Sequence, residues 1–363
     1  QWLPNYKKRW LKNDLFAGIT IGVILIPQGI AYAIIAGLPP IYGLYTAMIP
    51  QMVYAIMGTS RQLAIGPAAM DSLIVASGIS VLAAIGSDHF VVLAVLLAFM
   101  VGFFQFLFGI FRLGFLVNFL SKPVISGFTS GSAIIIGMNQ FGNLLGLNLD
   151  RSNQMQTLIL EIIEKFSDVH WPTALIGILS ILIIVGIKKI HKKIPAALIV
   201  VVLGIIIVYA FHLDLKGIMI LGEIPSGLPD FVIPSFDRAL IEEISGLALT
   251  LGLIGFMEAI SIAKSIEAKH NSYKVNANKE LVALGFGNMI GSFFQTYPAT
   301  AGFARTAVND QSGAKTPLSS LIAAIVIALS LIFLTPAFFF LPKTVLAAII
   351  IVAAYGLLDF SMP

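Results

Sequence analysis

Three ionisable side chains lie inside apolar stretches of this sequence, where a charge is costly and usually marks a functional site. Glu258 lies near the middle of an apolar segment at about 244–263. A bare carboxylate there needs a nearby partner or a proton, so we interpret Glu258 as a proton carrier or as a ligand of a coupling cation. A salt bridge or a capped carboxylate between helices is the structural alternative.

Arg305 and Asp71 each lie about one turn after a break that contains proline or glycine. Arg305 keeps its proton in proteins, so it would add a full positive charge to an anion site. Its structural alternative is to snorkel towards the cytoplasm or to pair with a carboxylate. Asp71 near a helix N-terminus is electrostatically favourable, and we expect a structural role for it. Its negative charge would oppose anion binding unless it were protonated or turned away.

The two breaks are alike and lie far apart in the chain. One reads Ala64-Ile65-Gly66-Pro67-Ala68-Ala69, and the other spans 297–305. In a bilayer, interrupted backbone survives only where it lines a cavity or is buried in protein. A helix that begins at each break directs roughly half a positive charge into that cavity, and matching breaks in two halves are the best sequence pointer to a transporter site. The sequence therefore predicts an anion site that includes Gly66, Gly302 and Phe303.

A third break, Ile26-Pro27-Gln28-Gly29, lies in the first apolar segment. A buried amide needs hydrogen-bond partners. Gln28 therefore either donates to an anion or satisfies the carbonyls that Pro27 frees, and the sequence leaves both roles open. Tyr32 lies one turn further on and would face the same cavity.

The elements that must hold these residues are membrane spans. Hydrophobic residues make up 58% of the chain and charged residues 11%, whereas a soluble domain carries about 25% charged residues. We therefore predict a polytopic membrane protein, and this length suffices for on the order of a dozen spans. The apolar segments lie at about 14–36, 41–57, 63–84, 90–111, 113–146, 172–187, 194–211, 244–263, 280–295, 300–309, 317–341 and 343–358.

Catalysis and metal binding find no support in the sequence. The chain has no cysteine, and its five histidines fall in predicted loops without metal-ligand spacing. We find no Ser/His/Asp arrangement, no phosphate-binding glycine loop and no paired catalytic carboxylates. We therefore expect neither an enzyme nor a bound cofactor or metal, although a co-transported H⁺ or Na⁺ fits the sequence.

Basic residues predict the orientation in the membrane. With a cytoplasmic N-terminus and alternating spans, sixteen of the 22 Lys and Arg residues fall in inside loops, five fall outside, and Arg305 lies within the membrane. This bias follows the positive-inside rule. We interpret the net charge of +4 and the basic cluster at 188–193 as topology signals. The expected partners are the lipid bilayer and a small anion, and not nucleic acid.

A long motif carries the resemblance of this chain to a known family. The run Pro40-Ile41-Tyr42-Gly43-Leu44-Tyr45-Thr46-Ala47, continued by Gly58-Thr59-Ser60-Arg61, is similar to the signature of the sulfate permease (SulP) family. The animal relatives of that family are the solute carrier 26 anion transporters. Four shorter runs resemble the same family: Ile26-Pro27-Gln28-Gly29, Ile65-Gly66-Pro67, Ala263-Lys264-Ser265 and Arg305-Thr306-Ala307-Val308-Asn309.

The resemblance implies an all-α polytopic membrane fold of two inverted seven-span repeats, at 1–237 and 238–363, with about twelve spans present. Spans one to four and eight to eleven would form a core domain and the rest a gate domain. The third and tenth spans would be half-helices that meet near the midplane. The anion site would carry over to Gln28, Tyr32, Ala68, Ala304 and Arg305. Glu258 matches an acidic position of relatives thought to be proton-coupled.

The chain departs from the family pattern at three points. Ala304 stands where many relatives have serine, which removes a hydroxyl donor. Ala68 stands where some animal relatives have an aromatic ring, which makes the site roomier. The chain stops at Pro363, whereas the family usually adds two more spans and a cytoplasmic STAS domain, so we expect a truncated chain.

These observations together predict secondary active transport of a small anion. The first expectation is proton-coupled sulfate uptake by an elevator-like movement of the core against the gate. Sodium-coupled bicarbonate uptake and an uncoupled anion exchanger or channel are the alternatives, and the signature at 42–61 argues against the related nucleobase permeases. We expect a multi-pass homodimer in the cell membrane with a cytoplasmic N-terminus.

Overall fold

Two compact units make up the chain, and each is built from both of its halves. The computed structural model describes residues 2, 4, 6–115, 130–131, 134, 137–149, 155–190, 195–270 and 273–355. Unit 1 comprises Gln1–Leu120 and Gly227–Ile332, and unit 2 comprises Ser121–Ser226 and Phe333–Pro363. This division confirms the predicted grouping of spans one to four with eight to eleven in a core, and of the others in a gate.

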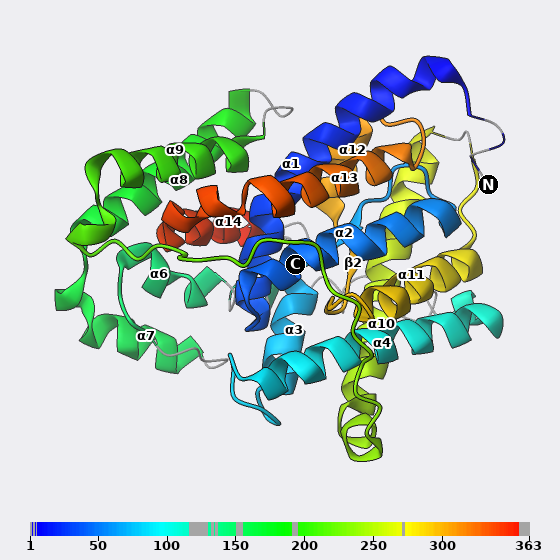
Figure 1. Cartoon of the computed structure of the whole chain (residues 1–363), viewed down its shortest axis with the longest axis horizontal. Helices are drawn as coiled ribbons and strands as arrows, with labels where there is room; N and C mark the ends of the chain where they lie inside the picture. Colours follow the sequence, from blue (N-terminus) through cyan, green and yellow to red (C-terminus); the bar gives the residue numbers. More distant parts are fainter. Residues whose placement is uncertain are drawn as a thin grey trace, which may run out of the picture. The chain divides into compact units, whose positions relative to one another are not determined.

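Unit 1 holds the long helices, and local signals explain where several of them begin and end. The side chain of Ser87 caps α4 by accepting a hydrogen bond from the Phe90 amide at 3.2 Å, and α1 ends at Gly37 in a left-handed conformation. The helices are η2 (Lys8–Trp10), α1 (Leu11–Ala36), α2 (Pro40–Met57), α3 (Ala69–Ile79), α4 (Asp88–Ile110), α10 (Arg238–His270), α11 (Ala277–Ser292), α12 (Phe303–Gln311) and α13 (Leu318–Phe333) (Figure 1).

Small residues let the helices of unit 1 approach closely. Figure 1 shows α4 and α11 side by side, and a Cβ atom at Gly102 of α4 would lie 2.6 Å from the carbonyl oxygen of Gly285 in α11. In the same way, a Cβ atom at Gly43 of α2 would lie only 1.9 Å from the carbonyl oxygen of Gly29 in α1. Such backbone contact is the usual way in which membrane helices pack, because lipid offers no hydrophobic drive for association.

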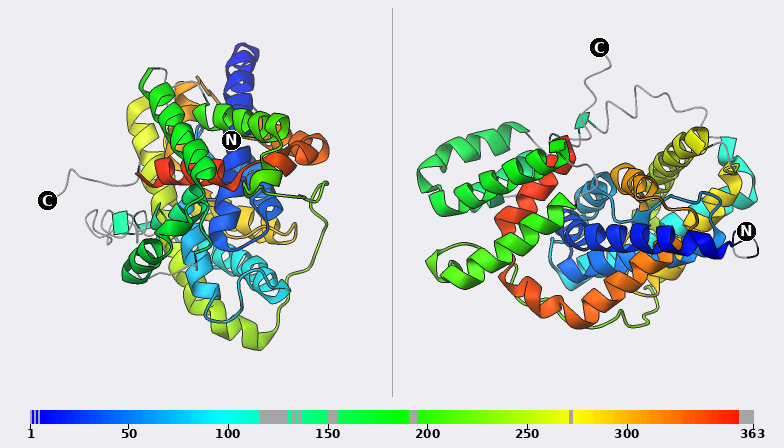
Figure 2. Two further views of the ribbon diagram at one scale, coloured as in Figure 1. Left: turned by 90° about the vertical axis from the view of Figure 1, so that its left-hand side faces the viewer. Right: turned by 90° about the horizontal axis from the view of Figure 1, so that it is seen from above.

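Unit 2 is a smaller group of helices around α14. Figure 2 shows α8 and α9, in green, as neighbouring helices, and α14 packs against both of them and against α6. The hydroxyl of Thr344 donates to the carbonyl of Thr173 at 3.2 Å, which ties the start of α14 to α8. The elements are α6 (Phe141–Leu145), α7 (Met155–Glu164), η4 (Phe166–Asp168), α8 (Trp171–Ile190), α9 (Ala196–Phe211), η5 (Asp214–Lys216), η6 (Thr335–Phe340) and α14 (Lys343–Tyr355).

The predicted membrane fold is confirmed, with corrections to single segments. Among the described residues, three helices are long and apolar enough to cross a membrane, at 8–36, 88–110 and 238–270. The segment expected at 317–341 divides into α13 and η6. The segment expected at 113–146 falls largely outside the described residues, as do 191–194 of the basic cluster and the last residues of the chain.

The most informative correction concerns the segment expected at 63–84. It is not one helix, because the short strand β1 (Ile65–Gly66) precedes α3, and a second strand, β2 (Thr300–Ala301), precedes α12. The all-α prediction therefore holds except at the two breaks, where the backbone is extended. The repeat boundary between residues 237 and 238 stays a prediction.

We expect Gly43→Ala to lower the melting temperature of the protein in detergent, because the new methyl group overlaps the backbone of Gly29. Overpacking of this kind typically costs about 1–3 kcal/mol of stability. Gly246→Ala in α10 is the control, since a Cβ atom there meets nothing within 4 Å. Equal melting temperatures for the two variants would contradict the close crossing of α1 and α2.

Candidate functional site

The two sequence breaks meet as a pair of antiparallel strands. Ile65 pairs with Ala301 and Gly66 with Thr300, and the amide of Gly302 donates to the carbonyl of Ala64 at 3.1 Å. Each strand leads directly into a half-helix, α3 or α12. Because the strands are antiparallel, the two half-helices leave the pair in opposite directions and their N-termini face one another. The predicted meeting of two half-helices is confirmed.

Buried polar side chains hold β2 in place. The amide side chain of Asn288 in α11 accepts from the Ala299 amide at 2.8 Å and donates to the Ala299 carbonyl at 3.0 Å, as a neighbouring strand would. The hydroxyl of Thr300 donates to the carbonyl of Gly255 in α10 at 2.8 Å. Gln105 of α4 completes the network by accepting from Asn288 at 3.2 Å. These bonds satisfy backbone groups that a bilayer could not.

The segment before β1 is held by α12. The Ala64 amide donates to the hydroxyl of Thr306 at 3.1 Å, and the side-chain amide of Asn309 donates to the carbonyl of Gln62 at 2.9 Å. Gly66 has a positive φ of 155°, which side chains rarely adopt. A Cβ atom on Gly66 would lie 3.8 Å from Nη2 of Arg305. That is an ordinary van der Waals distance, so the backbone conformation and not a lack of space favours glycine here.

Arg305 lies at the centre of this arrangement. Its side chain is 3% exposed and donates through Nη1 to the carbonyl of Pro67, and through Nη2 to the carbonyl of Thr300 at 3.4 Å. Its Nε–H is buried and has no hydrogen-bond partner. Among the described residues, no ion pair includes Arg305. The guanidinium thus reaches neither a surface nor a carboxylate, and its charge stays at the two helix starts.

Two carboxylates, the buried Asp71 and the half-buried Glu258, lie within electrostatic range of Arg305. Asp71 is in the first turn of α3 and Glu258 is in α10, and these helices pack against each other. The charges of both groups interact with Arg305 and with one another. Oδ1 of Asp71 and Oε2 of Glu258 are buried without a hydrogen-bond partner. The capped carboxylate, the structural alternative for Glu258, is therefore not seen at this oxygen.

Helix α1 brings the two remaining polar candidates to the same place. It packs against both half-helices, α3 and α12. Tyr32 is buried, and its hydroxyl interacts electrostatically with Arg305 and Glu258. Oε1 of Gln28 is buried and has no hydrogen-bond partner, so this oxygen does not satisfy a donor of the chain.

The structure separates the small and apolar candidates into two groups. Ala68 is the buried N-cap residue of α3, and Gly302 is the N-cap residue of α12. Phe303 is 62% exposed on unit 1 and Ala304 is exposed as well. These two residues therefore lie outside the buried group around Arg305.

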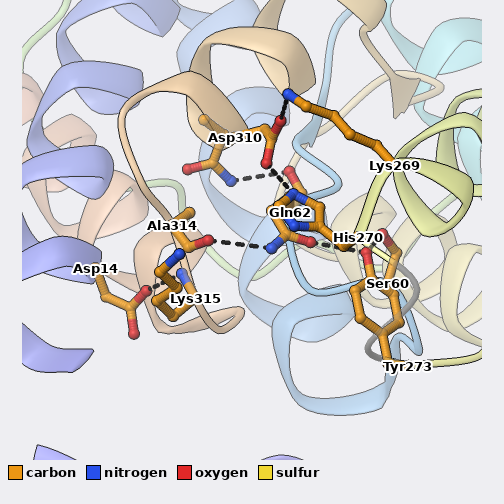
Figure 3. A network of polar contacts seen from close by, with 10 residues as sticks. Asp14, Ser60, Gln62, Lys269, His270, Tyr273, Asp310, Ala314 and Lys315 are labelled. Atoms are coloured by element: carbon orange, nitrogen blue, oxygen red, sulfur yellow. Dashed lines mark hydrogen bonds and ion pairs between the residues drawn. The ribbon is translucent and has the colours of Figure 1, made fainter. Parts of the chain in front are cut away.

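A second polar network joins the ends of several elements of unit 1, and sequence reasoning missed it (Figure 3). Asp310 at the end of α12 forms ion-pair contacts with Lys269 and His270 at the end of α10. The side-chain amide of Gln62 donates to the Ala314 carbonyl at 3.1 Å and its oxygen accepts from the Tyr273 hydroxyl at 2.7 Å. This network fixes the far end of α12, whereas the strand pair fixes its start.

Sequence reasoning also missed Asn288, Thr300 and Gln105. The available signal was a polar side chain within an apolar segment, as for Gln28. The sequence alone does not show which backbone group such a side chain meets.

Asn288→Ala should lower both the melting temperature and the affinity for a ligand of this site, because the amide and carbonyl of Ala299 lose their partners. Buried groups left unsatisfied in this way cost about 1–3 kcal/mol. Thermal unfolding and ligand binding, with the exposed Asn13→Ala as control, measure the two effects. A variant as stable as the control would refute the role of Asn288 in holding β2.

Comparison with known proteins identifies the family of this chain. The profile of the sulfate permease family matches residues 11–362. Over 99% of its length the chain is 44% identical to sulfate transporter 4.1, chloroplastic, of Arabidopsis thaliana, and covers 53% of that protein. It is 38% identical to the sodium-independent sulfate anion transporter of Bos taurus, again over 99% of its length, and covers 64% of it. The chain thus spans about half to two thirds of the length of these relatives.

Solved structures with the same fold agree with this assignment. The overall structure of SLC26A9 superposes with a TM-score of 0.91 at 26% identity, covering 99% of this chain and 59% of that one. The transmembrane domain of a cyanobacterium bicarbonate transporter, BicA, superposes with a TM-score of 0.86 at 29% identity, covering 98% of this chain and 91% of that one. The chain is therefore a multi-pass membrane protein that belongs to the sulfate permease family, a family of transporters and not of enzymes.

Proposed function

We propose that this chain is the membrane-embedded part of a secondary active transporter for a small inorganic anion, and that it takes up sulfate together with protons. The observation that carries the proposal is the placement of Arg305. Its buried guanidinium donates to carbonyls beside two opposed helix starts and keeps an Nε–H without a partner. An anion between the half-helices would meet a fixed positive charge and unused donors.

The electrostatics of the half-helices favour a negative ligand. Each helix start contributes roughly half a positive charge, and Arg305 adds a full one. Removing an anion from water costs tens of kcal/mol in an idealised apolar medium. Backbone amides at a helix start and a guanidinium fork replace part of the lost hydration.

The membrane potential opposes anion uptake, so uptake needs a co-transported cation or an exchanged anion. Each charge that crosses 100 mV changes the free energy by about 2.3 kcal/mol, so a dianion moved against an inside-negative potential of that size costs about 4.6 kcal/mol. Glu258 is our candidate for the proton carrier, because its Oε2 is buried without a partner and its charge interacts with that of Arg305.

The division into two compact units supports an elevator-like movement of the core against the gate. The end of unit 1 that carries the network of Figure 3 also carries Arg61, Lys269 and Lys315. By the positive-inside rule this end faces the cytoplasm, which supports a cytoplasmic N-terminus. A homodimer in the cell membrane completes the proposal.

Sodium-coupled bicarbonate uptake is the second candidate. Its support is the similarity to the transmembrane domain of BicA, a bicarbonate transporter, of which the chain covers 91%. In this case Glu258 would ligate sodium instead of carrying a proton. Replacing sodium by choline in an uptake assay separates the candidates, because only sodium-coupled uptake stops. Competition of bicarbonate, chloride and dicarboxylates with radiolabelled sulfate identifies the preferred anion.

Arg305→Lys should weaken sulfate binding at least tenfold. Lysine keeps the charge, but its ammonium group lacks the planar fork that donates to two carbonyls and still offers a free N–H. Direct binding of radiolabelled sulfate to the purified variant measures the loss. The control is Arg61→Lys, because the Arg61 guanidinium lies over the Tyr273 ring, away from the helix starts. Unchanged affinity of the Arg305 variant would show that the anion binds elsewhere.

Glu258→Gln should reduce the sulfate accumulation that a pH gradient drives in proteoliposomes. Loss of one coupled proton lowers the sulfate accumulation ratio about tenfold for each unit of the pH gradient. Glu242→Gln on the same helix is the matched control, since Glu242 is exposed and pairs with Arg238. Uphill uptake with an unchanged dependence on pH would show that Glu258 is the wrong residue.

A further inference from the structure

Asp14 and Glu280 are buried carboxylates of unit 1 whose oxygens accept several hydrogen bonds. Asp14 accepts from the amides of Lys315 and Thr316 and from the Thr316 hydroxyl. Glu280 accepts from the Tyr54 hydroxyl, from the amide and hydroxyl of Thr59 and from the Ser60 amide. Each of these carboxylates is buried with several hydrogen-bond donors around it, as a buried polar group requires.

Asp71 and Glu258 each have one buried carboxylate oxygen without a donor. Asp71 is 2% exposed, and its Oδ1 is buried without a hydrogen-bond partner. The N-cap residue of helix α3 is Ala68, and it provides no side-chain cap. Oδ1 of Asp71 does not supply that cap either, because it has no hydrogen-bond partner. The neighbouring Ser72 instead bonds to the Tyr297 hydroxyl at 3.1 Å. A first-turn acid is expected to have a structural role. Oδ1 of Asp71 makes no hydrogen bond that would support such a role.

The balance of charges at the helix starts decides whether an anion can bind. Anion binding is unfavourable when both carboxylates are ionised. Two helix starts and Arg305 together supply roughly two positive charges. Two ionised carboxylates would cancel them and leave nothing to attract an anion. With both carboxylates protonated, the same groups match the charge of a dianion.

The titratable and charged groups that face this pair come from all neighbouring elements. Arg305 of α12 acts on both carboxylates, Tyr32 of α1 lies in the field of Glu258, and Tyr297 before β2 lies in the field of Asp71. Neither tyrosine carries a charge at neutral pH. Arg305 is therefore the one permanent cation among these groups, and it cannot neutralise two carboxylates and an anion together.

We propose that Asp71 and Glu258 form a carboxylate pair that binds two protons when the anion occupies the site, so that two protons cross with each sulfate. This inference rests on the proposed function and assigns its stoichiometry. The protons bind from the same side as the anion and leave with it on the other side, and no other bond is made or broken. Transport of a dianion with two protons moves no net charge.

The stoichiometry can be measured in proteoliposomes that contain the purified chain, with radiolabelled sulfate and a membrane potential set by potassium and valinomycin. For the unmodified chain, we expect accumulation to rise about a hundredfold per pH unit and not to respond to the potential. Asp71→Asn should lower the rise to about tenfold per pH unit. It should also make accumulation change about tenfold per 60 mV, because one net charge now crosses with each sulfate.

Two further variants separate proton binding from a structural role. Asp71→Glu should keep the response of the unmodified chain to both gradients, because the carboxylate is retained. Asp88→Asn is the matched control, since Asp88 is the first-turn acid of α4 but is exposed. It should also leave both responses unchanged.

The possible failures point to different claims. If the unmodified chain accumulates sulfate without any response to pH, the proposed function fails. If the unmodified chain is proton-coupled and Asp71→Asn responds to both gradients in the same way as the unmodified chain, Asp71 carries no proton. The inference is then overturned. A potential-sensitive, tenfold response of the unmodified chain overturns it as well. If Asp71→Asn does not fold, the response of the unmodified chain to the potential still decides the stoichiometry.

Discussion

The bond between the Arg305 guanidinium and the Pro67 carbonyl joins two helix starts that lie 238 residues apart in sequence. The extended segments before these helices would expose unpaired backbone in the membrane, so each must find its partner inside the protein. They do so by pairing with each other as β1 and β2. The pairing places two positive helix ends beside a buried cation, an arrangement that favours negative charge.

The rest of unit 1 keeps this arrangement in place. Asn288 and Thr300 fix β2 against α11 and α10, and the contacts of Asp310 fix the far end of α12. Buried polar networks of this kind are costly unless every member is satisfied. Several buried polar atoms of the described residues nevertheless lack a partner, and four of them lie close to the helix starts. Gln28, Asp71, Glu258 and Arg305 each have a buried polar atom without a partner, and all four lie on elements that meet at the helix starts.

Much of the fold could be predicted from sequence, because hydrophobic segments and helix breaks are local signals. The breaks at Gly66 and Gly302 predicted the meeting of the two half-helices, and Arg305 lies where they meet. The strand pairing could not be predicted, since two strands of two residues have no periodicity and their partner is distant in sequence. The roles of Asn288 and Gln105 depend on which backbone group each amide reaches, and only tertiary structure shows this. For Asp71, the sequence favoured a structural role that its unpartnered oxygen does not support.

The position of the bound anion tests the central claim most directly. Selenate has the shape and charge of sulfate, and its anomalous scattering locates it in a crystal of the protein. We predict a single strong peak between the N-termini of α3 and α12, within hydrogen-bond distance of the Arg305 side chain. A peak elsewhere in the molecule, with none between these helix starts, would contradict the account.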